Sequence, residues 1–415
     1  MNRMNSWLLI ASCCAASAAG AVSSIGNVSL AADETGCVTI TYSLSSTPTV
    51  VTLDVTTNGV SVGGLALDRV VGDANRVVKN SECTIRWWPT GGLTAEKIAD
   101  ANMKAVLKTW TSRRMPDYFS IDLAYSNAVP RYYESRELIP GGEQDVRYKT
   151  NKLLMRRIPA AGMVTRCGFS PYEPDSNHPN TDAEIPHDVA LTYDYYMAVY
   201  ETTRAQYEMI TGKSLADGTD PLKPAGSIQL WMIRGVSTTN DGLDWPAGGH
   251  DSIVANSPID RLRKSTSIKF DLPTFAEWEI ACRAGTRTAC YNGTEDGLSD
   301  IAWTYSNSGI VPHDVGEKEP NAWGLYDMLG NVDEWVLDRY SEGADLIATF
   351  GQDWTPDKIV IDPVGATSGD QWCICGGGFN RESYRSRACY RNYGSKSYNR
   401  PDIGFRVVCP VPDIR

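Results

Sequence analysis

The residues best suited to chemistry in this chain lie within residues 321–335, around Gly330. Four side chains that carry oxygen donors crowd this glycine: Asp327, Asn331, Asp333 and Glu334. Hard cations such as calcium take carboxylate and backbone carbonyl oxygens from flexible loops of this kind. The alternative is a tight turn with solvated acids, in which glycine permits a backbone conformation that a side chain would block. The pattern alone leaves both interpretations open.

Two cysteines, Cys373 and Cys375, form a second candidate site just before the glycines at 376–378. Residues two apart on a strand face the same side of a sheet, so these sulfur atoms would lie close together. A thiolate pair binds soft ions such as copper(I) or exchanges disulfides. The alternative, which we favour, is that one or both thiols are bridged or buried. The sequence assigns no catalytic residue beyond this candidate pair.

Length, composition and charge restrict the class of protein. With 415 residues, 42% of them hydrophobic and 21% charged, the chain is globular and long enough for two domains. The net charge is −11 and no basic run is longer than a short pair, such as 113–114 or 156–157, which argues against a nucleic-acid surface. The histidines are too widely spaced to form a metal-binding motif: His178, His187, His250 and His313.

The N-terminus is typical of an export signal. Arg3 supplies a positive charge, residues 7–20 are mainly apolar or small, and residues 16–18 match a cleavage site. We therefore expect residues 1–20 to be a signal peptide, and the mature protein to be periplasmic, cell-surface or secreted. The apolar run before Cys13 is short, so a lipoprotein anchor is the less favoured alternative. Because no later run of about 18 apolar residues exists, we expect no transmembrane helix in the mature chain.

An exported chain meets an oxidising compartment, in which disulfides persist. Without Cys13 and Cys14, nine cysteines remain, so at least one thiol is free or pairs between chains. Cys37 and Cys83 stand alone in the first hundred mature residues. We therefore expect a disulfide between them.

The elements that must position these residues fall into two groups. Residues 25–124 contain short runs of alternating apolar and polar residues with turn signals between them, which predict an all-β, immunoglobulin-like or fibronectin-like sandwich. Residues 125–152 are polar, and we expect an extended linker there. Beyond residue 153 the pattern predicts a helix that Thr202 caps and a second helix with a capping box at 274–277. The pattern there indicates an irregular α+β domain.

Five segments occur in the order typical of one family: residues 158–163, 187–207, 272–286, 321–335, and the pair 376–379 with 403–406. Together they resemble the formylglycine-generating enzyme superfamily, the sulfatase-modifying-factor domain, over residues 153–411. Five ordered motifs make a specific match, whereas any one alone would be weak. The resemblance implies that family's variant of the C-type-lectin-like fold, which is loop-rich and α+β.

The resemblance also implies metal ligands. The family's calcium ligands correspond to Asp327, Gly330, Val332 and Glu334, of which Gly330 and Val332 act through backbone carbonyls. The family's enzymes oxidise a sulfatase cysteine to formylglycine with copper(I) held by two cysteines that follow a Gly-Gly-Ser segment. Residues 376–388 contain no cysteine, so we expect calcium but no copper.

By the same resemblance, aromatic and arginine side chains line the surface near the glycines: Trp372, Phe379, Tyr384, Arg385, Arg387 and Arg391. Such a set suits a carbohydrate, a sulfated sugar or a peptide. The alternative is that the arginines pair with acids such as Glu279 and Glu334. The resemblance also places Cys282 near Cys389, and we expect a second disulfide there.

These observations predict an exported protein of this family that binds a ligand or has a structural role rather than catalysing a reaction. Its partner would be a glycan or a protein. The alternative is a formylglycine-generating oxidase, or a divergent oxidoreductase, that acts on sulfatase cysteines.

Overall fold

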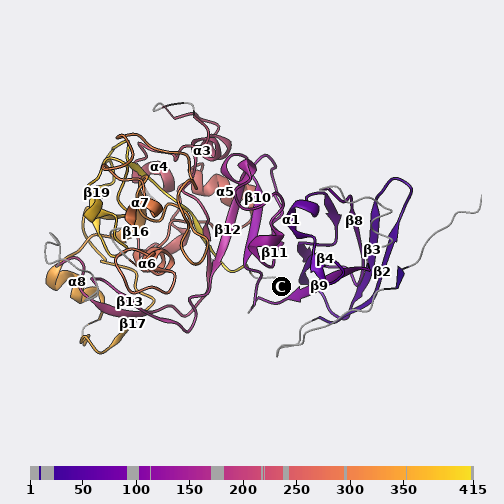
Figure 1. Ribbon diagram of the computed structural model, residues 1–415. Helices are drawn as coiled ribbons and strands as arrows, with labels where there is room; N and C mark the ends of the chain where they lie inside the picture. The colour runs from indigo at the N-terminus through magenta and orange to yellow at the C-terminus, as the bar shows by residue number, and fades with distance from the viewer. Residues whose placement is uncertain are drawn as a thin grey trace, which may run out of the picture. The chain divides into compact units, whose positions relative to one another are not determined.

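The structure is a computed structural model (Figure 1) that describes residues 9–10, 23–90, 102–112, 114–169, 182–215, 218, 220–236, 243–293, 297–351 and 353–412. The predicted signal peptide, residues 1–20, lies outside the described residues except for Leu9 and Ile10. The chain divides into two compact units. Unit 1 comprises Met1–Ile121, Val129–Asp145 and Val411–Arg415, and unit 2 comprises Asp122–Ala128 and Val146–Pro410.

Unit 1 is β-rich and contains two larger sheets. The first has the strand order β1 (Leu9–Ile10), β2 (Ile25–Ala32), β3 (Val38–Leu44), β8 (Glu82–Trp87) and β6 (Val70–Gly72). The second has the order β5 (Val60–Ser61), β4 (Thr49–Thr57) and β7 (Arg76–Val78), with β9 (Met103–Trp110) also paired to β4. Alternate residues of β3 and β8 are buried, and they share one hydrophobic cluster with residues of β4 and β9. The predicted all-β character of this region is confirmed, with α1 (Gly63–Ala66) as a single turn of helix.

The predicted disulfide between Cys37 and Cys83 is absent from the structure. The antiparallel register of β3 and β8 pairs Tyr42 with Cys83 and Val38 with Trp87. Cys37 therefore lies at one end of this strand pair and Cys83 at the other. Each residue advances a strand by about 3.3 Å, whereas a disulfide requires Cα atoms within roughly 7 Å. The register, which the sequence did not reveal, separates the two sulfur atoms.

The segment predicted to be an extended linker, residues 125–152, is packed. Strand β11 (Arg131–Tyr133) pairs antiparallel with β10 (Tyr118–Asp122), and two 3-10 turns follow, η1 (Arg136–Leu138) and η2 (Val146–Lys149). Tyr132 and Tyr148 are buried. Isolated aromatic residues within a polar stretch anchor the backbone, because each of them buries a large apolar area.

Unit 2 has short strands and helices joined by long loops. Its antiparallel sheet β12-β15-β21 comprises Lys152–Ile158, Tyr195–Ala198 and Val408–Pro410, and its sheet β13-β14-β17 comprises Val164–Cys167, His187–Ala190 and Ile359–Ile361. A third sheet, β19-β18-β16-β20, comprises Asn392–Ser395, Gln371–Cys375, Asp333–Arg339 and Ile403–Gly404. The helices are α3 (Arg204–Thr211), α4 (Leu230–Arg234), α5 (Pro258–Thr266), α6 (Phe275–Arg283), α7 (Leu298–Ile301) and α8 (Gly343–Thr349), with 3-10 turns η3 (Gly249–Asp251) and η4 (Ser383–Arg385).

The two helices that the sequence predicts in this unit are present, and both begin at or next to the predicted capping residue. Helix α6 begins at a capping box, in which Thr274 Oγ1 accepts from the Glu277 backbone N–H at 3.2 Å and Glu277 accepts from the Thr274 N–H at 2.8 Å. Helix α3 has the same arrangement, but its cap is Thr203 rather than the predicted Thr202. All nine residues of α6 are buried. A helix that is buried on every side belongs to the interior of its unit.

The third sheet brings three of the recognised motifs together. Glu334 on β16 lies opposite Cys375 on the antiparallel strand β18 and opposite Gly404 on the parallel strand β20. Figure 1 shows β16 and β19 in the same part of unit 2 as α6 and α7. The acidic loop, the cysteine pair and the Gly-Phe-Arg segment are therefore neighbours, although Glu334 and Arg406 are 72 residues apart along the chain.

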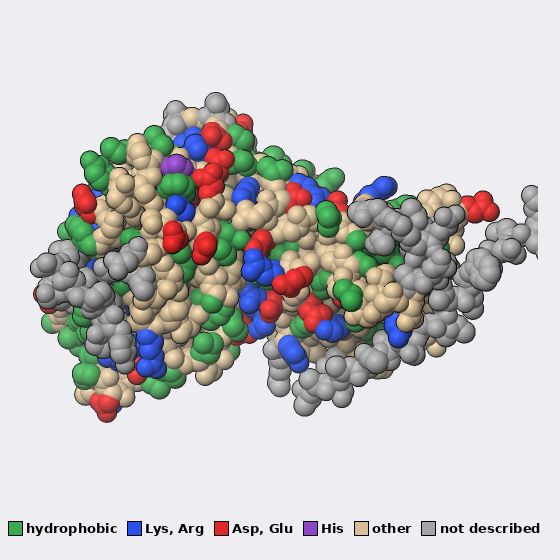
Figure 2. All heavy atoms as spheres, viewed as in Figure 1, with side chains coloured by type: hydrophobic (Ala, Val, Ile, Leu, Met, Phe, Trp, Pro, Cys, Tyr) green, Lys and Arg blue, Asp and Glu red, His purple; other side chains and the backbone are tan. Residues whose placement is uncertain are grey.

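Two observations concern the surface of the protein. Among the described residues, no helix has the length and apolar content that crossing a membrane requires. On the face in Figure 2, acidic and basic side chains of the described residues are interspersed.

Candidate functional site

A buried arginine lies against the loop that the sequence singled out. The Arg406 guanidinium is fully buried and pairs with the Glu334 carboxylate, with Nη2 2.6 Å from Oε1 and Nε 2.8 Å from Oε2. The same guanidinium donates to the carbonyl oxygens of Ala198 at 3.1 Å and Tyr326 at 2.9 Å. It therefore supplies positive charge to a carboxylate and to inward-facing carbonyls.

The other polar groups of this loop are also satisfied within the protein. Trp278 Nε1 donates to Glu334 Oε2 at 2.7 Å, and Asp327 Oδ2 accepts from the Gly316 N–H at 2.6 Å. The Asn331 side chain donates to Glu201 at 2.7 Å. Burial raises the pKa of Asp327 to about 6 and the pKa of Glu201 well above its ordinary value. A dense internal network thus holds the loop.

These contacts bear on the calcium set, Asp327, Gly330, Val332 and Glu334. Both carboxylate oxygens of Glu334 are engaged by Arg406 and Trp278, and the Asp327 carbonyl lies 3.3 Å from an Arg406 nitrogen. Within the described ranges, no three His, Cys, Asp or Glu side chains are arranged to hold a metal ion. The Glu334 carboxylate therefore already has a cationic partner in the Arg406 guanidinium, and the calcium site at these four residues stays a prediction.

The cysteine pair is inaccessible. Cys373 and Cys375 are fully buried, carry unbridged thiols and belong to the main hydrophobic cluster of unit 2. Burial raises the pKa of the Cys373 thiol to about 12 and the pKa of Cys375 well above its usual value. The thiolate is the form that attacks disulfides and binds metals, so neither group is poised for either reaction at neutral pH.

The second predicted disulfide, Cys282–Cys389, is not formed either, because the two thiols have separate environments. Cys282 Sγ lies 3.9 Å from the Met328 carbonyl oxygen, whereas Cys389 Sγ lies 3.4 Å from a Glu184 carboxylate oxygen. The nine cysteines in the described residues are all unbridged and buried.

The structure divides the predicted ligand pocket. Tyr384, Arg385 and the neighbouring Tyr390 form one cluster, which we call the tyrosine–arginine surface. Arg385 donates to the Tyr390 hydroxyl at 2.9 Å and to the Tyr384 hydroxyl at 3.2 Å, and its guanidinium lies 5.3 Å from the Tyr384 ring centroid. Tyr384 is 38% exposed. Tyr384 and Arg385 are thus accessible to a ligand at the protein surface, whereas Tyr390 is buried behind them.

The other four residues of that set are buried, and of these Arg387 adjoins the cluster, because its Nε donates to the Tyr384 carbonyl oxygen at 2.7 Å. Arg387 forms a two-pronged ion pair with Glu184, at 2.8 and 2.9 Å. Trp372 packs under the Arg339 guanidinium at 4.6 Å, Phe379 is buried, and Arg391 lies over the Phe275 ring. The alternative in which arginines pair with acids is thus confirmed for Arg387, although its partner is neither Glu279 nor Glu334. Since 203 residues separate Glu184 from Arg387, no local signal revealed the pair.

One of the four oxygen donors that the sequence placed around Gly330 holds the glycine loop in place, a role that the sequence did not reveal. Asp333 Oδ1 accepts from the Gly377 N–H at 2.8 Å, and Arg381 pairs with Asp402 at 2.6 Å. Burial raises the pKa of Asp333 to about 7. Gly377 has a φ of 74°, and a Cβ atom there would lie 2.5 Å from Ser386 Oγ, so only glycine fits.

The comparisons with known proteins assign the chain to a family. Residues 138–411 match the model of the Sulfatase-modifying factor enzyme 1-like domain, and the chain belongs to that family. The match covers well over half of the chain and begins before the predicted boundary at residue 153.

Three curated relatives illustrate the similarity. The chain is 36% identical over 238 residues to the formylglycine-generating enzyme of Thermomonospora curvata, which covers 50% of this chain and 73% of that protein. It is 28% identical over 272 residues to the formylglycine-generating enzyme of Mus musculus, covering 54% and 68%. It is 32% identical over 181 residues to the chaperone protein LppX of Paenibacillus barcinonensis, covering 36% and 63%.

Among solved structures, Treponema denticola variable protein 1 is similar at 22% identity and a TM-score of 0.46. The superposition covers 62% of this chain and 95% of that chain.

Proposed function

We propose that this chain is an exported, non-catalytic binding module, in which the family scaffold presents the tyrosine–arginine surface to a glycan or protein ligand. The state of the cysteines is the observation that supports this most. A copper(I) site of the family's kind needs two thiolates that both metal and substrate can reach. In this chain the loop after the glycines contains no cysteine. Cys373 and Cys375 are fully buried in the core, and burial raises the pKa of both thiols.

The chemistry of the tyrosine–arginine surface supports a binding role. The exposed ring of Tyr384 offers an apolar face for the C–H groups of a sugar, and Arg385 offers a planar set of donors for sulfate or carboxylate groups. The two tyrosine hydroxyls hold Arg385 in one orientation. A ligand therefore meets a partly pre-organised guanidinium, which lowers the entropy cost of binding.

Unit 1 fits the same proposal. Its two larger sheets share one hydrophobic cluster, which is the arrangement of a β-sandwich. Modules of this kind commonly serve as spacers or binding platforms on exported proteins. The N-terminal sequence supports export through a signal peptide.

A binding screen tests the proposal. The full mature chain is applied to an array of neutral, sulfated and carboxylated glycans, and Arg385→Ala and Tyr384→Ala are compared with Arg287→Ala, an exposed arginine that lies outside the tyrosine–arginine surface. We expect binding that both surface variants lose and the control variant keeps. Binding that is equal in all four proteins would place the ligand elsewhere.

The names of the relatives make the oxidase the alternative to test. Copper(I)-loaded protein is incubated with a cysteine-containing sulfatase peptide, and formylglycine is measured by mass spectrometry. We expect no turnover. Turnover that disappears in Cys375→Ser would refute the non-catalytic proposal.

A further inference from the structure

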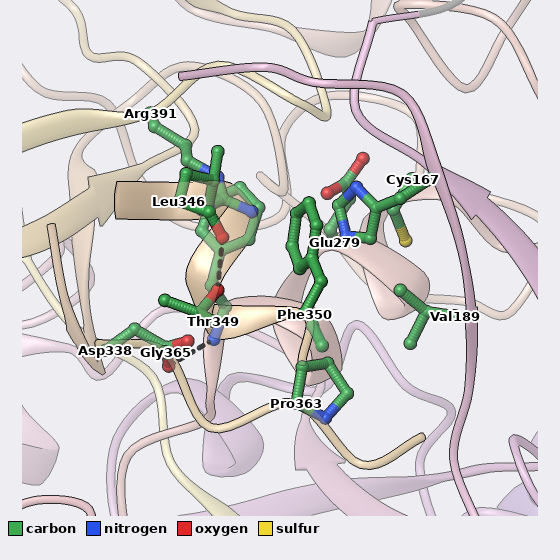
Figure 3. Close-up of a pocket in the computed structure, with 13 residues that line it drawn as sticks. Cys167, Val189, Glu279, Asp338, Leu346, Thr349, Phe350, Pro363, Gly365 and Arg391 are labelled. Atoms are coloured by element: carbon green, nitrogen blue, oxygen red, sulfur yellow. Dashed lines mark hydrogen bonds between the residues drawn. The ribbon is translucent and has the colours of Figure 1, made fainter. Parts of the chain in front are cut away.

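Unit 2 contains a pocket that none of the functions discussed above uses. Side chains from α6, α8, β14 and β16, together with Arg391, line a pocket that is partly open to solvent. Figure 3 shows Leu346, Thr349 and Phe350 around this space, with Glu279, Asp338 and Arg391 at its borders. Of the six residues predicted to form a ligand pocket, only Arg391 lines it.

Arg391 differs from the other buried arginines of this unit. Its side chain is 8% exposed, and its guanidinium carbon lies 3.8 Å from the Phe275 ring centroid. Arg387 and Arg406 each have a carboxylate partner at 2.6–2.8 Å, whereas Arg391 makes no hydrogen bond and no ion pair with any described residue. Burying a guanidinium without an acceptor is costly, so this group favours an incoming oxyanion.

The acids beside Arg391 do not provide that acceptor. Glu279 Oε1 accepts from Arg283 at 2.8 Å and from the Gly168 N–H at 2.8 Å, while Glu279 Oε2 is buried without a hydrogen-bond partner among the described residues. Asp338 Oδ2 accepts from the Phe275 N–H at 2.7 Å, and burial raises the pKa of Asp338 to about 7. The pocket thus has an unused donor set on Arg391 and an unused acceptor on Glu279.

We propose that this pocket binds a small organic monocarboxylate that also carries a hydroxyl or amino group. The carboxylate pairs with the planar fork of Arg391, which matches carboxylate geometry in a two-pronged contact. The hydroxyl or ammonium group donates to Glu279 Oε2. Apolar side chains of Val189, Leu346 and Phe350 surround the short carbon skeleton between these two groups.

Charge selects a monoanion over a dianion such as sulfate or hydrogen phosphate. Among the described residues, Arg391 is the one Lys or Arg that lines the pocket, and His187 is neutral because burial lowers its pKa to about 3. Two carboxyl groups, Glu279 and Asp338, line the same space. One ligand charge balances Arg391, whereas a second would face these carboxyl groups without compensation. This proposal is independent of the tyrosine–arginine surface.

Glycolate is the probe, since it combines a carboxylate with a neighbouring hydroxyl. The melting temperature of the full mature chain is measured against glycolate, acetate and chloride at equal ionic strength. We expect a saturable rise with glycolate, a smaller rise with acetate, which lacks the donor, and none with chloride. An absent glycolate effect would overturn the proposal, and equal effects of glycolate and acetate would overturn the role of Glu279.

Variants locate the binding. Arg391→Gln removes the charge and should abolish the glycolate response. Thr349→Trp, on the pocket wall, should block the site while Arg391 remains, and Ala348→Trp, exposed on the same helix, is the matched control that should keep the response. An unchanged response in Arg391→Gln would refute the proposal. If that variant does not fold, an unchanged response in Thr349→Trp would refute it equally.

Discussion

Replacing Glu334 by glutamine should strongly destabilise unit 2, because it leaves the Arg406 guanidinium buried without a counter-charge. The glutamine has nearly the same shape, and its carbonyl oxygen can still accept from Trp278. The substitution therefore removes the ion pair while creating little empty space. It also tests directly whether Arg406, rather than a calcium ion, is the cation that this loop needs.

The contacts set the expected magnitude. Glu334 is 1% exposed and Arg406 is completely buried, and their closest nitrogen–oxygen distance is 2.6 Å. Breaking a buried ion pair by removing one partner costs roughly 3–5 kcal/mol, because the remaining charge has lost both its solvent and its partner. We therefore expect the free energy of unfolding to fall by about this amount. The double variant Glu334→Gln/Arg406→Met should recover part of the loss, since it removes the orphaned charge as well.

Urea unfolding, followed by tryptophan fluorescence, measures the effect in the presence of EDTA and in the presence of calcium chloride. Glu382→Gln is the matched control, because Glu382 is exposed in the same unit. The wild-type curve should be the same in both solutions. A loss below about 1 kcal/mol in Glu334→Gln, or a stabilisation by calcium that only the wild type shows, would refute the reasoning and favour a calcium site.

Three further predictions follow from buried groups. Burial raises the pKa of Asp338 to about 7, so the stability that its protonated form contributes is complete below about pH 4 and is lost as the pH rises through 7. The free energy of unfolding of Asp338→Asn should therefore exceed that of the wild type by roughly 4 kcal/mol at pH 8 and by little at pH 4. Parallel pH profiles of the two proteins would contradict this. A thiol reagent should label nine cysteines in the unfolded mature protein, but neither Cys373 nor Cys375 in the native protein within the same time. If fewer than nine cysteines of the unfolded protein are labelled without reductant, the protein contains a disulfide. Gly330→Ala should cost about 1–3 kcal/mol in chemical unfolding, because its Cβ would lie 2.5 Å from the Trp303 carbonyl oxygen at a φ of 79°; an unchanged midpoint would show that the loop can shift.

The helix and strand signals that the sequence carries are local, and the structure bears out most of them. The capping box at Thr274 fixes the start of α6, because its two hydrogen bonds involve residues only three apart. The alternation in β3 identifies its buried face for the same reason. The family was recognisable because five such segments occur in a fixed order, and the match over residues 138–411 confirms it.

The predicted disulfides and the predicted ligand pocket depended on distances between remote residues, and here the sequence was insufficient. Cys37 directly precedes β3 and Cys83 lies in the neighbouring strand β8, but the register places them at opposite ends of the strand pair. Arg385 and Arg387 are two residues apart, yet one lies at the surface with tyrosines while the other is buried with Glu184. Nothing near these residues in the sequence distinguishes the two arginines.

By itself the sequence determined the family and the absence of cysteine from residues 376–388, because these are properties of residue order and type. Only the tertiary structure decided which buried arginine forms an ion pair with which carboxylate. Arg406 joins Glu334 across 72 residues and Arg387 joins Glu184 across 203, while Arg391 is left without a partner among the described residues. The physical reason is that an ionic contact requires atoms within about 4 Å, and such proximity arises from packing of remote segments rather than from any pattern along the chain.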